Sequence, residues 1–211
     1  MSSWLRILQQ RQYLPVIAKM PTPTPTPTPT PLPLPTLANH DFEQGRVGWT
    51  ESIQNLSGTP LPGKLIYSQQ EQIVSGAQGN MYAWLGGARN QINELSQNVE
   101  IPTGYDDVRI RFLYSIRSQE TNCDNDLVQV RIAATPVSVT PQPGGDHRLC
   151  INMSNYFGQA VTANLSEYAG KEVTLSFWTR LNETLNSNYF LDVVELCSNQ
   201  DGVDTRRCDF D

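Results

Sequence analysis

Proline occupies every second position from residue 21 to residue 35 in the run PTPTPTPTPTPLPLPT, and this run limits the possible folds more than any other feature. The proline ring fixes φ and removes the backbone N–H donor, so neither a helix nor an internal strand forms there. We expect residues 21–37 to be a linker, either a polyproline II spacer of roughly 45–50 Å or simply disordered. No core is predicted before Leu37, and residues 1–20 are expected to be disordered or a short helix.

The chain after residue 38 alternates apolar and polar residues in short segments, which is the pattern of half-buried β-strands. Ile110 and Phe112 share one face of the segment 108–116, and Leu175 and Phe177 share one face of the segment 172–180. In the last segment Phe190, Val194 and Leu196 are expected to point inward. Turn signals such as IPTGYDD and TPQPGGD separate the segments, and no long stretch has helical spacing. We therefore predict one all-β domain over residues 38–198, a two-sheet antiparallel β-sandwich. The expected strands are VRIRFLYSI (108–116), LVQVRI (127–132), EVTLSFWTR (172–180), NYFLDVVEL (188–196) and, more weakly, MYAWLG (81–86) and LSQNVEI (95–101).

Charge and hydropathy exclude several classes of partner. The formal net charge is −6, which disfavours binding to a phosphate backbone, so no nucleic acid partner is expected. No apolar stretch approaches the ~20 residues that a transmembrane helix needs, so no transmembrane segment is expected. Residues 1–20 lack the apolar core of a signal peptide, and no signal peptide is evident in this chain.

The four cysteines limit the kind of redox compartment in which the chain is expected to fold. They form no CxxC motif, and with only two histidines in the chain a zinc site is not expected. An even number of cysteines in a turn-rich chain favours disulfides and an oxidising compartment, with buried free thiols as the alternative. Four cysteines allow three pairings, and the pattern alone does not choose among them. They are Cys123, Cys150, Cys197 and Cys208.

Six segments together resemble one family of domains. They are NHDFEQGRVGW, AWLGG, LSQNVEIP, VRIRFLYSI, NLSEYAGKEVTLSFW and NSNYFLDVVEL. Their order resembles that of bacterial jelly-roll modules of the galactose-binding-like and carbohydrate-binding type, which are often joined to secreted or surface proteins by Pro/Thr linkers. The resemblance implies a jelly-roll β-sandwich, an extracellular or cell-surface location, and a glycan or cell-surface polymer as ligand. Ligands differ widely within such folds, so the resemblance is more specific for fold than for function.

The resemblance also implies a structural calcium ion. Many such modules join their first and last strands through a carboxylate of an N-x-D-F-E segment and an aspartate of the last strand. The matching positions here are Glu43 and Asp192, with backbone carbonyl groups near Asn39 and Asp41 as further ligands. Calcium binds six to eight oxygen atoms, which carboxylates and carbonyls supply. The alternative is that Glu43 and Asp192 are solvated edge residues or cap backbone amides.

The resemblance further favours one pairing of the cysteines. Some relatives carry a cysteine just before the strand that matches LVQVRI and another on the next strand, which are the places of Cys123 and Cys150. Cys197 and Cys208 would then close a short loop. We therefore expect residues 199–211 to form a tail that a disulfide ties to the last strand.

The strands 109–117, 127–132 and 173–180 are expected to share one sheet, whose outward face is the candidate ligand site. A sugar ring stacks on an aromatic face while polar side chains bind its hydroxyl groups. The alternative is that outward strand residues are simply polar and that a loop shields the tryptophan. A second candidate site is the loop-end aromatics Tyr67, Tyr105, Tyr156 and Phe157. The predicted ligand-binding residues of the sheet face are Arg109, Arg111, Gln129, Arg131, Trp178 and Arg180.

The leading function is therefore a non-catalytic extracellular binding module for carbohydrate, with Ca²⁺ as a structural cofactor. The main alternative is a structural or protein-interaction module of a secreted or surface protein, in which another protein is the partner. A hydrolase is the third hypothesis. Neither His40 nor His147 neighbours a nucleophile motif, and no carboxylate pair stands out by its spacing, so the chain is not expected to be an enzyme.

Overall fold

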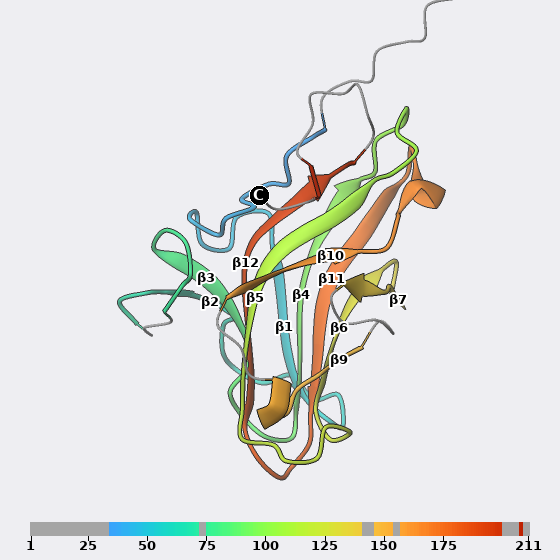
Figure 1. The fold of residues 1–211 in the computed structure, drawn as a ribbon. Coiled ribbons are helices and arrows are strands. Elements are labelled where there is room, and N and C mark those ends of the chain that lie inside the picture. The colour runs from blue at the N-terminus through green and yellow to red at the C-terminus, as the bar shows by residue number, and fades with distance from the viewer. Residues whose placement is uncertain (1–33, 72–74, 141–145, 154–156, 200–206, 209–211) are drawn as a thin grey trace, which may run out of the picture.

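The computed structural model of this chain describes residues 34–71, 75–140, 146–153, 157–199 and 207–208, which form a jelly-roll β-sandwich of two antiparallel sheets (Figure 1). Sheet A has the order β1-β4-β11-β6-β7, with β9 also paired to β6, and sheet B has the order β2-β3-β12-β5-β10-β8. The predicted all-β architecture is confirmed. The expectations for residues 1–33 lie outside the described residues.

Five of the six predicted strands have bounds within two residues of the prediction, whereas the one predicted at 95–101 begins at residue 91. The strands at 50–55, 66–68, 135–136, 139–140, 146–148 and 158–162 were not predicted. Two short 3-10 helices, η1 (Ile151–Met153) and η2 (Ser166–Tyr168), lie between strands, and no helix in the described ranges is long and apolar enough to cross a membrane. Sheet A contains β1 (Thr50–Asn55), β4 (Gln91–Glu100), β6 (Leu127–Ile132), β7 (Thr135–Pro136), β9 (Asp146–Arg148) and β11 (Glu172–Leu181). Sheet B contains β2 (Ile66–Ser68), β3 (Met81–Gly86), β5 (Arg109–Ser118), β8 (Val139–Thr140), β10 (Gly158–Thr162) and β12 (Ser187–Cys197).

The core lies between the two sheets and follows the alternation of the sequence. Ile110 and Phe112 of β5 and Leu175 and Phe177 of β11 are all buried in it. The rings of Phe112 and Phe177 come from opposite sheets and meet edge to face, with centroids 5.1 Å apart. Burial of each such side chain contributes roughly 1.5–3 kcal/mol, so the predicted inward positions of these two strands are the ones that hold the sheets together.

The last strand departs from the prediction at Phe190. Its neighbours in sequence lie in the core between the sheets, so Phe190 points to the outer face of sheet B. The pairing of β12 with β5 shifts between Asp192 and Glu195, where Val193 has a φ of 45°. This β-bulge reverses the alternation of the strand, so Val194 points inward as predicted while Phe190 does not.

The folded domain begins earlier than predicted. Leu34, inside the expected linker, is 7% exposed and belongs to the core cluster together with Leu37. The prediction that no core forms before Leu37 is therefore wrong. The physical reason is that leucine replaces threonine in the last repeats of the proline run, and an apolar side chain gains free energy by packing against the sandwich.

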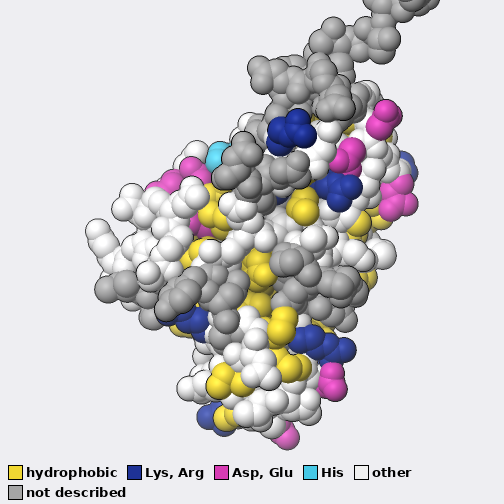
Figure 2. Space-filling view, in the orientation of Figure 1, with side chains coloured by type: hydrophobic (Ala, Val, Ile, Leu, Met, Phe, Trp, Pro, Cys, Tyr) yellow, Lys and Arg dark blue, Asp and Glu magenta, His cyan; other side chains and the backbone are white. Residues whose placement is uncertain are grey.

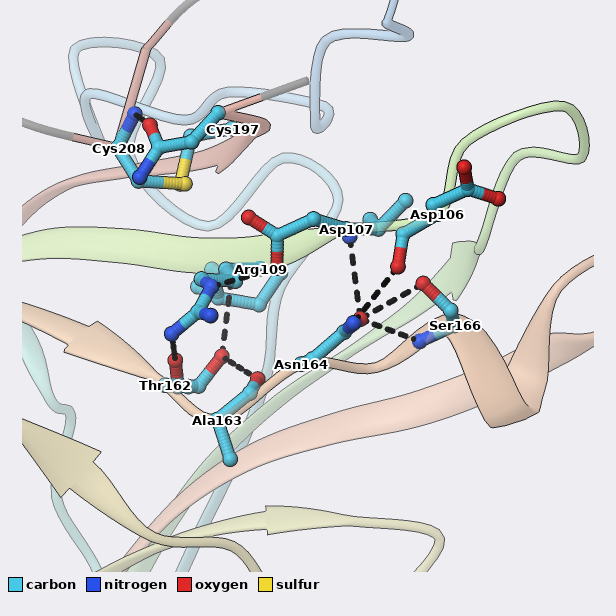
Figure 3. Close-up of polar contacts among 12 residues, drawn as sticks. Asp106, Asp107, Arg109, Thr162, Ala163, Asn164, Ser166, Cys197 and Cys208 are labelled. Atoms are coloured by element: carbon cyan, nitrogen blue, oxygen red, sulfur yellow. Dashed lines mark hydrogen bonds and ion pairs between the residues drawn. A yellow bond between two sulfur atoms is a disulfide. The ribbon is translucent and has the colours of Figure 1, made fainter.

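Both disulfides have the predicted partners. Cys123 is bonded to Cys150 across 27 residues, and Cys197 is bonded to Cys208 across 11 residues. The second bond holds residue 208 of the tail against the end of β12 (Figure 3). The remaining tail residues, 200–206 and 209–211, lie outside the described residues.

Candidate functional site

Trp178 projects from the outer face of sheet A on the middle strand β11. Its sequence neighbours Phe177 and Thr179 are fully buried on the inner face, which places the indole outside. The cross-strand neighbours of Trp178 are Glu94 of β4 and Gln129 of β6. The indole itself is half-buried. The sheet therefore presents one large aromatic ring flanked on both sides by polar side chains.

The guanidinium group of Arg131 covers part of this ring. Its central carbon lies 3.7 Å from the centroid of the Trp178 ring system. The Nε of Arg131 donates a hydrogen bond of 2.7 Å to the Oε1 of Gln129, which holds the guanidinium group in place. A planar guanidinium over an indole combines cation–π attraction with stacking. The two side chains thus form a fixed amphipathic surface.

Charged groups of both signs surround this surface. Arg180 is exposed on β11, two residues beyond the tryptophan, and Glu94 is half-buried on the neighbouring strand. We call the surface formed by Glu94, Gln129, Arg131, Trp178 and Arg180 the Trp178 face.

Arg109 and Arg111 do not belong to the Trp178 face, which corrects the prediction that the three strands share one sheet. β5 lies in sheet B, whereas β6 and β11 lie in sheet A. Alternation determines whether a side chain points inward or outward, but it does not determine which sheet a strand joins. Arg109 pairs with Asp107 at 2.7 Å (Figure 3), and Arg111 pairs with Glu195 at 2.7 Å.

Arg109 and Arg111 instead link β5 to neighbouring segments of the chain by hydrogen bonds. An Nη of Arg109 donates to the carbonyl oxygen of Thr162 at 3.5 Å (Figure 3), which links β5 to the end of β10. An Nη of Arg111 donates to the carbonyl oxygen of Arg207 at 2.7 Å, which links β5 to the disulfide-bonded tail. Both contacts stabilise the end of sheet B rather than a ligand surface.

Glu43 and Asp192, the predicted calcium ligands, both accept hydrogen bonds from backbone N–H groups. The Oε1 of Glu43 accepts from two such groups at the start of β3, at 2.7 and 2.8 Å. The carboxylate of Asp192 accepts from the N–H groups of Gln78 and Val193, at 2.6 and 2.9 Å. Each carboxylate therefore has the capping role that was the alternative to metal binding.

Asn39 orders the turn that leads into β1. Its Nδ2 donates to the carbonyl oxygens of Gly45 and Val47, and its Oδ1 accepts from the N–H of Gln44. The backbone carbonyl oxygen of Asn39 accepts from the indole N–H of Trp49 at 3.0 Å and from a second backbone N–H at 3.2 Å. Both acceptor positions of this carbonyl are thus in use, so Asn39 is a poorer candidate ligand than the carboxylates.

Asp192 is fully buried, and its surroundings are acidic. The pKa of Asp192 is raised from 3.8 to about 7: burial is the main cause, the charges of Glu43 and Asp41 also raise it, and two backbone hydrogen bonds oppose the shift. Beside it lies a cavity of about 460 Å³ whose lining includes Asp41, Glu43 and His40, together with Glu195 and its ion-pair partner Arg111. Figure 2 shows acidic side chains grouped beside a histidine at the edge of this view.

A cation would relieve the charge at this place, and the donor atoms are of the oxygen type that calcium prefers. Within the described residues no group of three or more His, Cys, Asp or Glu side chains is arranged to hold a metal ion. Glu43 and Asp192 therefore supply at most two carboxylates, and a calcium ion here would need backbone carbonyls and water for the rest of its ligand shell.

Sequence reasoning missed an aromatic cluster on the outer face of sheet B. Tyr82 and Phe190 are buried in it, and Tyr67, Trp84 and Phe157 pack against them. The Trp84 ring lies 5.3 Å from that of Tyr67 and 5.8 Å from that of Phe190, measured between centroids. The alternation in MYAWLG, which places its tyrosine and tryptophan on one face, was the signal that could have found it.

The predicted loop-end aromatics separate in the structure. Tyr67 and Phe157 belong to the aromatic cluster, whereas Tyr105 is 4% exposed and lies in the core between the sheets. Tyr156 lies outside the described residues. The four residues therefore do not form one site.

No family model and no curated protein matches this sequence, but a search of solved structures finds similar chains. The carbohydrate-binding module TmCBM61, solved with β-1,4-galactotriose, is 14% identical with a TM-score of 0.47, over 76% of this chain and 96% of that chain. The K1 cleaved adhesin domain of Lys-gingipain from Porphyromonas gingivalis W83 is 16% identical with a TM-score of 0.45, over 79% and 99%. The Stig cyclase Fisc from Fischerella sp. TAU is 13% identical with a TM-score of 0.43, over 77% and 97%.

Further carbohydrate-binding modules are among the similar structures. At these identities and scores the likeness concerns architecture alone, and a shared architecture hosts unrelated functions.

Proposed function

We propose that this chain is a non-catalytic extracellular module that binds a glycan on the Trp178 face. The observation that carries the proposal is the half-buried indole of Trp178, held under the guanidinium group of Arg131 and flanked by Glu94 and Gln129 on the outer face of sheet A. Sugar rings present apolar C–H groups on one side and hydroxyl groups at their rim. An aromatic ring surrounded by hydrogen-bonding side chains complements both.

The position of the ring also supports binding. β11 is the central strand of sheet A, so the Trp178 side chain rests on a rigid support rather than on a loop. A side chain that is already ordered loses little conformational entropy when a ligand binds. The guanidinium groups of Arg131 and Arg180 add donors that suit hydroxyl or carboxylate groups of a sugar.

Two disulfides support the extracellular part of the proposal, because such bonds persist in oxidising environments.

A glycan-array screen of the full chain tests the proposal. We expect binding that Trp178→Ala abolishes and that Trp178→Phe retains in part, because phenylalanine keeps a stacking ring. The matched control is Arg109→Ala, which removes an outward arginine from the opposite sheet and is expected to leave binding unchanged. A folded protein that binds no glycan would overturn the proposal and favour the protein-interaction hypothesis.

We further propose that the carboxylates of Glu43 and Asp192, with backbone carbonyl groups near Asp41, hold a structural calcium ion between the start of the domain and β12. The buried carboxylate of Asp192, whose pKa is raised by burial and by two nearby acids, supports this assignment. The positive charge of the ion would offset the repulsion between the carboxylates of Glu43 and Asp192. The protein groups contribute their oxygen atoms and position them through the backbone hydrogen bonds of Glu43 and Asp192.

A further inference from the structure

A cleft of about 260 Å³ lies where the edge strands of the two sheets, β1 and β2, approach each other. The rings of Tyr67 and Trp84, both half-buried, form part of its wall. We propose that this Tyr67–Trp84 cleft is a second ligand site, independent of the Trp178 face, and that it binds one neutral sugar ring.

The indole of Trp84 is held rigidly at the cleft. Its Nε1 donates a hydrogen bond of 3.0 Å to the Oδ1 of Asn188, and its ring contacts that of Phe190. Gly87 has a φ of +82°, and a Cβ atom there would lie 2.5 Å from the Cζ2 atom of Trp84. The turn therefore needs glycine, because any side chain would displace the indole. The ring is thus ordered before a ligand arrives.

The second aromatic ring stands at an angle to the first. The ring planes of Tyr67 and Trp84 are inclined by 53°, with centroids 5.3 Å apart, so the pair forms a corner rather than a flat stack. The Nζ of Lys64 lies 4.9 Å from the centroid of the Tyr67 ring and is ion-paired with Glu71. A corner of two rings contacts an apolar ring face and its edge at the same time.

Gly63 and Ile53 also line the cleft and lie close together. Gly63 has a φ of +152°, and a Cβ atom there would lie 2.8 Å from the Cδ1 atom of Ile53. Gln91, which is 8% exposed, contributes an amide side chain to the lining. The cleft therefore has apolar walls and a small number of polar groups, which is the composition of small-ligand sites.

Charge and size define the class of ligand. Among the described residues that line the cleft Lys64 alone is charged, and its charge is balanced by Glu71, so the cleft favours a neutral ligand. Its volume is slightly below the about 300 Å³ at which sites for drug-sized molecules begin. A single hexose or N-acetylhexosamine unit matches that size, whereas an extended oligosaccharide suits the open Trp178 face.

The test follows the indole N–H resonances of the ¹⁵N-labelled full chain by NMR during titration. The probes are galactose, glucose, mannose and N-acetylglucosamine, each added separately. We expect at least one sugar to shift the Trp84 resonance. Tyr67→Ala is expected to weaken that binding by about tenfold or more, since it removes one side of the corner.

Two variants separate this site from the Trp178 face. Trp178→Ala is expected to leave the Trp84 shift and its midpoint unchanged, whereas Trp84→Ala is expected to abolish sugar-dependent shifts of the residues around the cleft. If Trp84→Ala does not fold, the sugar affinity of Tyr67→Ala decides whether the cleft is the binding site. Loss of the Trp84 shift in Trp178→Ala, full affinity in Tyr67→Ala, or no shift of Trp84 with any of the four sugars would each overturn the proposal.

Discussion

The guanidinium carbon of Arg131 lies 3.7 Å from the centroid of the Trp178 ring on the outer face of sheet A. The two residues come from adjacent strands, β6 and β11, so their contact depends on sheet pairing rather than on closeness in sequence. This surface, the carboxylates of Glu43 and Asp192, and the two disulfides can each be tested by substitution.

Arg131→Lys is expected to weaken glycan binding by about three- to tenfold while it leaves the melting temperature nearly unchanged. Lysine keeps the charge but lacks the planar group that stacks on the indole and bonds to Gln129. Isothermal titration calorimetry with a glycan found on the array measures the change. Arg109→Lys, on the opposite sheet, is the control, and equal losses in both variants would contradict the role of the stacked pair.

Glu43→Gln is expected to remove the response of the protein to calcium. The amide keeps an acceptor oxygen for the N–H groups at the start of β3 but loses the negative charge that a cation requires. In the unaltered protein, calcium in excess of its dissociation constant is expected to raise the melting temperature by several degrees. Scanning calorimetry in calcium and in chelator checks both, and identical curves for the unaltered protein would refute the calcium site.

In chelator, the free energy of unfolding is expected to fall as the pH rises from about 4 to 7. The pKa of Asp192 is raised from 3.8 to about 7 in the folded state, chiefly by burial. In this window the folded state keeps a proton that the unfolded chain has lost, so a rise in pH favours unfolding, by up to about 4 kcal/mol. Urea titrations across the window measure the slope.

Asp192→Asn is the matched control for this pH dependence, because asparagine is similar in shape and does not titrate. It is expected to flatten the slope between pH 4 and 7. An unchanged slope in Asp192→Asn would show that other groups cause the dependence.

Removal of the Cys123–Cys150 bond is expected to cost more stability than removal of the Cys197–Cys208 bond. The first closes 27 residues and the second 11, and chain entropy predicts losses of roughly 3.6 and 2.8 kcal/mol. Double Cys→Ser variants, compared by urea unfolding, measure the difference. A larger loss for Cys197→Ser with Cys208→Ser would mean that the tail contacts of Arg111 outweigh the entropy of the loops.

Alternation was sufficient for the longer strands and for most of their inward positions, but not for β1, β2 or β10 and the short strands β7, β8 and β9. Alternation in VRIRFLYSI and EVTLSFWTR placed Phe112 and Phe177 in the core, where they meet. The physical reason is that period-two patterning reports burial directly, residue by residue.

The sheet that each strand joins, and the β-bulge in β12, could not be predicted from the alternation of apolar and polar residues. β5 has the same pattern as β6 and β11 yet joins the other sheet, because pairing depends on long-range contacts that no local segment encodes. Phe190 was misplaced because one extra residue at Val193 reverses the alternation, and a bulge of this kind leaves no mark in the pattern. For this reason Arg109 and Arg111 were wrongly added to the Trp178 face, and the cluster around Trp84 was missed.

The most direct measurement of the central claim is the affinity of the full chain for an array-identified glycan, compared with that of Trp178→Ala. Trp178→Ala is expected to lower the affinity at least about tenfold, because loss of a stacked ring costs on the order of 1.5 kcal/mol. The unfolding curve of the variant is expected to match that of the unaltered protein. Unchanged affinity in a folded Trp178→Ala protein would show that the Trp178 face is not the glycan site.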